Sequence, residues 1–158
     1  MATLFNEDDN STSILMIGGL QSDTPTKNCW IFDPITEEFS QTGSLNLIRI
    51  QHSCSQIPNT DTVGCIGGYS NELYPAFGDK RLRNMEVFDP QTQSWTLTKH
   101  FIPVYDDFII FGASMVPLEN SNIVAGGSSP KYGQLDLIFE YHYQMGFRQL
   151  DVFLSEPR

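Results

Sequence analysis

One unit recurs along this chain, and that repetition constrains the fold more than any other feature. An apolar run ends in a Gly-Gly pair three times, at Gly19, Gly68 and Gly127, which are 49 and 59 residues apart. Two turns also match, at 33–39 and 89–95, and both read Asp-Pro-x-Thr-x-x-aromatic. A small repeated unit cannot bury its apolar face alone, so neighbouring units must stack and share a core.

Each marker of the repeat has a physical role. The carboxylates of Asp33 and Asp89 can accept backbone N–H groups, and the proline that follows presets φ, so both motifs predict tight turns between antiparallel strands. Paired glycines permit positive φ and the close approach of a neighbouring backbone. The pairs are Gly18 and Gly19, Gly67 and Gly68, and Gly126 and Gly127. A bulky ring follows each turn and is expected to fill the space between successive units. These rings are Phe39, Trp95 and Phe147.

The segments between these markers predict four short strands in each unit. Aromatic residues make up 12% of the chain, which also holds 12 glycines and 9 prolines, and this combination favours short strands joined by turns. No segment keeps a period of three to four residues over the length of a helix. The strands of the second unit are expected at 49–57, 62–68, 83–90 and 94–100, and those of the third at 107–117, 122–127, 135–142 and 147–150. In the first unit the opening strand is nearly missing, because only 2–5 precedes an acidic loop.

Taken together, these residues resemble the kelch repeat. The resemblance rests on the Gly-Gly pairs, the Phe-Asp-Pro turns at 32–34 and 88–90, the three rings, and an Arg49-x-x-His52 element that opens the second unit. It covers most of 14–158, although the third unit has His142 and Tyr143 in place of Asp-Pro. The kelch family implies a β-propeller with repeats near 50 residues. The expected fold is therefore all-β, a partial kelch-type propeller of about three four-stranded blades with an incomplete first blade.

The resemblance also gives expected boundaries for the blades. Blade 1 is predicted at about 1–44, blade 2 at about 45–101 and blade 3 at about 102–152, and 153–158 would begin a further blade. A propeller closes with about four to eight blades. Three arrangements stay open: a fragment of a larger propeller, which we favour, a six-bladed ring made by two chains, or an open arc.

Charge and cysteine content bound the surroundings of the protein. The net charge of −10 disfavours nucleic acid and anionic membrane surfaces as partners. The first residues lack a basic and apolar leader, so a cytoplasmic location is expected. Three cysteines, Cys29, Cys54 and Cys65, suggest reduced thiols. If 58–61 forms a hairpin turn, however, Cys54 and Cys65 fall opposite each other, so a bond between them is left open.

No constellation in the sequence predicts catalysis, a metal site or a cofactor. His52, His100 and His142 fall in separate units, without a second ligand at metal spacing. The pair Asp106 and Asp107 is interpreted as a solvated turn. The favoured function is a non-catalytic protein–protein interaction module, and the resemblance implies a substrate adaptor or a cytoskeletal binder. The alternatives are a propeller enzyme of the galactose oxidase or sugar isomerase type, and a truncated product without function.

Loops that follow the Gly-Gly pairs supply the candidate binding surface. In a propeller these loops, here 20–27, 69–83 and 128–134, share one rim with the connections between blades. The second loop is the longest and concentrates aromatic and basic residues, which protein interfaces favour. The candidate residues are Tyr69, Tyr74, Phe77, Lys80, Arg81, Arg83, Lys131 and Tyr132.

A three-bladed arc is expected to associate with other copies of itself. Its end blades would expose apolar faces that repeat architectures normally cap, and its strand edges would be open to pairing. Sedimentation velocity at micromolar concentration should therefore show dimers or larger species. A compact monomer under those conditions would count against an open arc.

Overall fold

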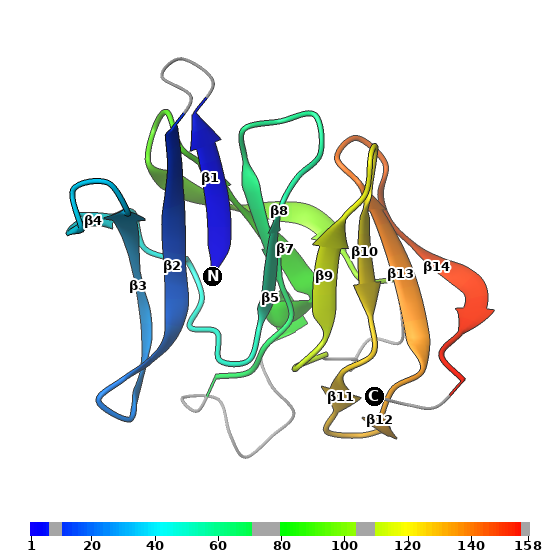
Figure 1. Ribbon diagram of the computed structural model, residues 1–158. Coiled ribbons are helices and arrows are strands. Elements are labelled where there is room, and N and C mark those ends of the chain that lie inside the picture. The colour runs from blue at the N-terminus through cyan, green and yellow to red at the C-terminus, as the bar shows by residue number, and fades with distance from the viewer. Residues whose placement is uncertain (7–10, 71–79, 104–109, 156–158) are drawn as a thin grey trace.

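The computed structural model describes residues 1–6, 11–70, 80–103 and 110–155, and within them the chain forms three antiparallel four-stranded sheets. The sheets stand side by side as successive blades (Figure 1). This arrangement confirms the predicted all-β fold and the partial propeller. The described part of the chain contains no helix with the length and apolarity that a membrane crossing requires.

Blade 1 has its full complement of strands. Its order is β1-β2-β3-β4, with β1 at Ala2–Asn6, β2 at Ser11–Gln21, β3 at Thr24–Asp33 and β4 at Glu38–Thr42. The opening strand that the sequence left nearly missing is present, because β1 pairs with β2 along its whole length, from Ala2↔Leu15 to Asn6↔Ser11. The strand β2 is long enough to pair with every residue of β1.

Blades 2 and 3 repeat this order with shorter inner strands. Blade 2 consists of β5 (Ser53–Gln56), β6 (Val63–Ile66), β7 (Asn84–Asp89) and β8 (Ser94–Phe101). Blade 3 consists of β9 (Ser114–Pro117), β10 (Asn122–Ala125), β13 (Leu137–His142) and β14 (Gly146–Phe153). A short 3₁₀ helix, η2 (Lys80–Arg83), precedes β7, and a two-stranded hairpin of β11 (Ser128–Ser129) and β12 (Gly133–Gln134) lies between β10 and β13. The opening strands β1, β5 and β9 follow one another across the molecule (Figure 1).

Two apolar clusters fill the spaces between the blades. The first joins blades 1 and 2 and consists of Leu15, Ile17, Cys29, Leu45, Val63, Cys65, Phe88 and Trp95. The second joins blades 2 and 3 and consists of Ile57, Ile66, Met85, Ile102, Ile110, Met115, Val124, Leu135, Phe139 and Tyr141. Each cluster draws residues from two sheets, so neither blade can bury its face without the other.

The three rings that follow the turns occupy different surroundings. Trp95 is buried in the first cluster and packs on Phe88, with ring centroids 5.2 Å apart. Phe147 packs on Tyr141 at 4.7 Å, against the second cluster. Each ring thus faces the preceding blade. Phe39 differs from the expectation: it is 58% exposed and contacts Phe32 of its own blade, because no preceding blade covers that face among the described residues.

The turns carry the bonds that their aspartates suggest. Asp33 Oδ1 accepts the backbone N–H of Ile35 at 2.8 Å and that of Thr36 at 3.3 Å. Asp89 Oδ1 accepts the N–H of Gln91 at 2.9 Å. These bonds satisfy backbone donors that the turn would otherwise leave to solvent, so each turn holds its two strands in register.

The second glycine of a pair binds the chain segment that leads into the next blade. Gly19 N donates to Arg49 O at 3.1 Å, and Gly68 N donates to Ile110 O at 2.8 Å. All six glycines of the pairs have positive φ, between 50° and 89°. A Cβ at Gly67 would lie 2.4 Å from the carbonyl oxygen of Ile110. A side chain there would separate blade 2 from the segment that opens blade 3.

The contribution of close packing at these glycines can be separated from that of their backbone conformation. Gly68→Ala should lower the free energy of unfolding more than Gly19→Ala does, by about 1–3 kcal/mol. Both residues have nearly the same φ, 86° and 87°, so they share the cost of a side chain in the left-handed region. A Cβ would lie 2.8 Å from Ile50 O at position 68, whereas among the described residues it would meet nothing within 4 Å at position 19. Urea denaturation of the two variants measures the difference, and equal losses would contradict the packing explanation.

Candidate protein-binding rim

The first and third of the loops that follow the glycine pairs lie on one side of the molecule. The β2–β3 connection and the β11–β12 hairpin both point to the lower rim in Figure 1, where the described connection from β4 to β5 also runs. The turns between β5 and β6 and between β9 and β10 lie on the opposite rim. We refer to the lower side as the loop rim and to the other as the turn rim.

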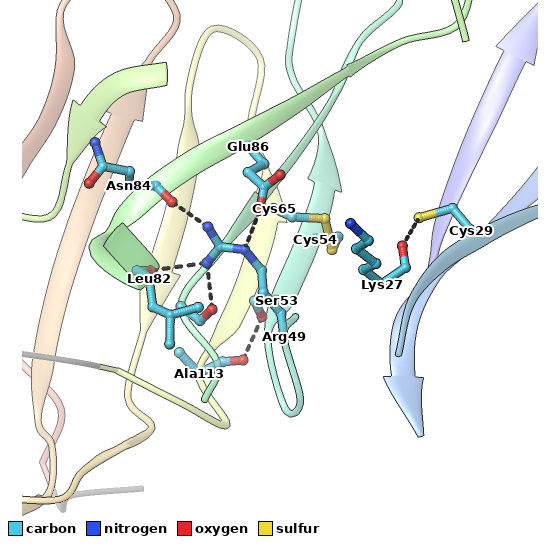
Figure 2. Close-up of a disulfide and its surroundings, with 11 residues drawn as sticks. Lys27, Cys29, Arg49, Ser53, Cys54, Cys65, Leu82, Asn84, Glu86 and Ala113 are labelled. Carbon is cyan, nitrogen blue, oxygen red and sulfur yellow. Dashed lines mark hydrogen bonds and ion pairs between the residues drawn. A yellow bond between two sulfur atoms is a disulfide. The ribbon is translucent and has the colours of Figure 1, made fainter. Parts of the chain in front are cut away.

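A buried arginine fixes the base of the longest loop on the loop rim. Arg49 Nη1 donates to Gly67 O at 2.7 Å and to Leu82 O at 3.0 Å, and Nη2 donates to Asn84 O at 2.8 Å. Figure 2 shows these bonds fanning out from one guanidinium group. Gly67 lies just before the loop 69–83, Leu82 lies in its last residues and Asn84 follows it, so a single side chain holds both ends of the loop.

Glu86 on β7 provides the counter-charge for this arginine. Its Oε1 lies 2.9 Å from Arg49 Nε, and both side chains are fully buried. The Glu86 carboxylate also accepts hydrogen bonds from the connection between blades 1 and 2, from Asn46 N at 2.6 Å, Asn46 Nδ2 at 3.0 Å and Leu47 N at 3.3 Å. A buried ion pair is stable only when its remaining donors and acceptors are satisfied, as they are here by backbone groups. The pair therefore joins the blade 1–blade 2 connection, the loop base and β7.

Sequence reasoning missed Glu86. In the repeat alignment its position corresponds to Trp30 in the first unit and Phe139 in the third. A lone carboxylate at a position that is otherwise aromatic, within the apolar run 85–88, is the signal that could have identified it. Charged residues are almost never fully buried unless they are paired, so a carboxylate buried at this position requires a buried cation as its partner.

The described candidate residues fall into three places on the loop rim. Tyr69 is half-buried: its backbone pairs with Ile50 and its ring meets Phe111 edge-on, with centroids 5.6 Å apart. Arg83 is also half-buried, with its guanidinium 5.1 Å from the ring centroid of Phe101. These contacts give both residues a structural role in addition to any binding role.

A third pair lies on the β11–β12 hairpin and is the more accessible one. The Lys131 ammonium is 5.2 Å from the ring centroid of Tyr132, and that tyrosine is 42% exposed. Phe101, the partner of Arg83, is 44% exposed. The loop rim therefore presents two cation–aromatic pairs to solvent, and aromatic residues and arginine are enriched in protein interfaces.

The remaining candidates are described only in part. Tyr74 and Phe77 lie outside the described residues. The backbones of Lys80 and Arg81 form the first turn of η2, and their side chains also lie outside the described part. Leu82, the next residue of η2, is buried and anchors this helix beneath the rim.

The turn rim carries a hollow that the sequence did not predict. A cavity of about 290 Å³ is lined by three turns, at 57–60, 120–121 and 141–145. Asn59 Nδ2 donates to Asn120 Oδ1 at 3.2 Å across two of these turns. The lining residues come from three separate hairpins, so only the packing of blade 2 against blade 3 brings them together.

One disulfide changes the expected state of the cysteines. Cys54 and Cys65 face each other in register on β5 and β6, with Cα atoms 4.2 Å apart, and are bonded. The expectation of reduced thiols does not hold for this pair, because the hairpin places the two residues directly opposite each other.

Cys29 is a buried free thiol, and burial raises its pKa. Burial, and then the charge of Arg49, lowers the pKa of neighbouring His52 to about 4.

Comparison with known proteins finds Kelch-like protein 25 of several organisms among the relatives of this chain. No family model matches the chain. Kelch-like protein 25 of Xenopus tropicalis is 27% identical over 119 residues, which are 73% of this chain and 19% of that protein. The proteins of the same name from Rattus norvegicus and Homo sapiens are 26% and 25% identical over the same shares. The chain thus spans about a fifth of the length of these relatives.

A solved structure of YjhT shares the fold. Its TM-score is 0.71 at 16% sequence identity, and the match covers 92% of this chain and 50% of that chain. At this identity the likeness concerns the fold alone. The three blades therefore superpose on half of a larger protein.

The contribution of the buried Arg49–Glu86 pair to stability can be compared with that of the more exposed Glu140–Arg148 pair. Glu86→Gln should lower the free energy of unfolding by about 3 kcal/mol or more, because Arg49 would stay buried without a counter-charge. The matched control is Glu140→Gln, whose partner Arg148 is 68% exposed, and it should cost about 1 kcal/mol or less. Denaturant titration at neutral pH measures both losses. Comparable losses would show that burial of the Arg49–Glu86 pair carries no special weight.

Proposed function

We propose that this chain, which resembles kelch proteins in sequence and forms three blades of a β-propeller, is a non-catalytic module that binds a protein partner through its loop rim. The observation that carries the proposal is the Arg49 clamp. Arg49 holds the described ends of the 15-residue loop 69–83 together, and holding the ends of a binding loop in place lowers the entropic cost of binding. The clamp thus prepares the longest loop for binding.

Charge indicates the chemistry of the partner. The chain has nine lysines and arginines and a net charge of −10, yet four of the nine lie in the two short segments 80–83 and 128–134. Basic and aromatic residues in these two segments of an otherwise acidic chain favour an acidic partner segment that also carries apolar side chains. The partner expected here is therefore an acidic peptide segment of another protein.

The adaptor role is part of this proposal, and the resemblance to the kelch family supports it. Kelch modules that present a bound protein to another enzyme do so together with companion regions, and this chain matches about a fifth of each Kelch-like protein 25. We assign to the module the partner-binding part of such an adaptor, with cytoskeletal binding as the competing outcome. The cytoplasmic location stays a prediction, and the oxidation state of Cys54 and Cys65 in cells bears on it.

Affinity capture with rim variants tests the proposal. The double variant Lys131→Glu with Tyr132→Ala should reduce capture of protein partners by about tenfold, since it removes a cation and an aromatic anchor together. The control, Tyr143→Ala with Met145→Ala, changes residues that are 53% and 75% exposed on the turn rim and should leave capture unchanged. Quantitative mass spectrometry identifies the partners, and acidic peptides derived from them should bind more weakly as salt rises.

Either of two results would overturn the loop rim as the binding surface. Capture could be lost in the turn-rim control and kept in the loop-rim variant. Alternatively, the captured proteins could bind both variants with the affinity of the parent chain. Circular dichroism of each variant excludes unfolding as the cause of a loss.

A further inference from the structure

Three potential metal ligands meet on the face of blade 2 that points toward blade 1. His52 directly precedes β5 and Cys54 is the second residue of that strand, and a spacing of two residues along an extended chain places side chains on the same face. Cys65 stands directly opposite Cys54 on β6. The imidazole nitrogen and the two sulfur atoms all lie within 4.8 Å of one another.

The imidazole of His52 has an unused nitrogen that is cut off from water. Its Nδ1 is buried and makes no hydrogen bond to any described residue. A buried polar atom without a partner costs about 1–3 kcal/mol, so such an atom suggests a partner that is absent from this state. The neighbouring Gly68 leaves room for the ring, since a Cβ there would lie 3.0 Å from the Cβ of His52.

We propose that His52, Cys54 and Cys65 form a site for one thiolate-preferring cation, of the kind represented by Zn²⁺ and Cu⁺, when the disulfide is reduced. A dithiol reductant first transfers two electrons and two protons to the S–S bond, which gives two thiols and the oxidised cyclic reductant. The cation then displaces both thiol protons and binds two thiolates and the neutral imidazole. The disulfide and the metal site are therefore alternative links between the same two strands.

The donor set fits this class of cation. Thiolate and imidazole are the ligands that Zn²⁺ and Cu⁺ prefer in proteins, with metal–sulfur and metal–nitrogen distances of about 2.3 Å and 2.0 Å. Ligands at these distances are separated by roughly 3.5–4 Å, so small side-chain rotations suffice from the observed spacing. His52 and Cys54 are half-buried whereas Cys65 is fully buried, so a cation would enter past the first two residues. Zn²⁺ would complete four-coordination with a water molecule, and Cu⁺ would need only the three protein ligands.

Metal titration of the reduced full chain tests this site. After reduction by a dithiol and removal of the reductant without oxygen, the chain should bind one equivalent of Zn²⁺ or Cu⁺ and show thiolate-to-metal absorption in the ultraviolet. The oxidised chain should bind neither. Competition with a chromophoric chelator gives each affinity, and the preferred cation separates the two coordination geometries.

Variants assign the three ligands. Cys54→Ser should abolish the absorption band, and His52→Ala should weaken binding by about tenfold or more, at least the loss that follows removal of a supporting group at a metal site. Cys29→Ala and His142→Ala serve as controls and should bind as the parent does, because each changes one residue of the same type elsewhere. Failure of the reduced parent to take up either cation, or unchanged affinity in His52→Ala, would overturn the three-ligand site.

Loss of folding on reduction would still give a decisive readout. If the reduced chain loses its strand circular-dichroism signal, adding the cation should restore that signal in the parent and in the two controls, but not in Cys54→Ser or His52→Ala. A signal that the cation does not restore in the parent would contradict the proposal. This test is independent of the loop rim, so its outcome does not affect the proposed function.

Discussion

Close backbone contact between successive blades is the constraint on which this structure depends. Gly19 and Gly68 each donate an N–H to a carbonyl of the segment that leads into the following blade. Positive φ turns the strand end toward that segment, and the absence of a side chain at Gly67 lets the carbonyl of Ile110 come within van der Waals distance. Because this contact sets the spacing of the sheets, the apolar clusters between them can close around Trp95 and Phe147.

Blade 2 differs from the other two blades because it buries an ion pair beside these backbone contacts. Glu86 occupies a position where the other units have an aromatic ring. In place of apolar packing, the Arg49–Glu86 pair binds three backbone carbonyls at the loop base and two backbone amides in the connection between blades 1 and 2. Such a trade adds little to stability compared with an apolar core but specifies one arrangement of the chain. The loop that it specifies is also the longest and the most basic. The ion pair that fixes the loop base and the loop proposed to bind a partner therefore belong to the same blade.

Several elements could be read from the sequence, and particular residues show why others could not. The turns at Asp33 and Asp89 and the strands next to them are local, because their hydrogen bonds join residues two or three positions apart. Phe39 looked equivalent to Trp95, but a ring packs against the blade before its own, and only the assembled molecule shows which face is covered. The cavity on the turn rim escaped prediction for the same reason, since three hairpins distant in sequence line it.

The sequence by itself determined the class of fold, the number of blades and the ends of most strands. Glycine pairs, Asp-Pro turns and short apolar runs act over a few residues, and their effects repeat with the unit. Only the tertiary structure decided that Arg49 pairs with Glu86, that Cys54 and Cys65 form a disulfide, and that His52 lies close to both sulfur atoms. Those relations depend on strand register and on the faces that side chains occupy, and a shift of one residue in register would move every side chain to the other face.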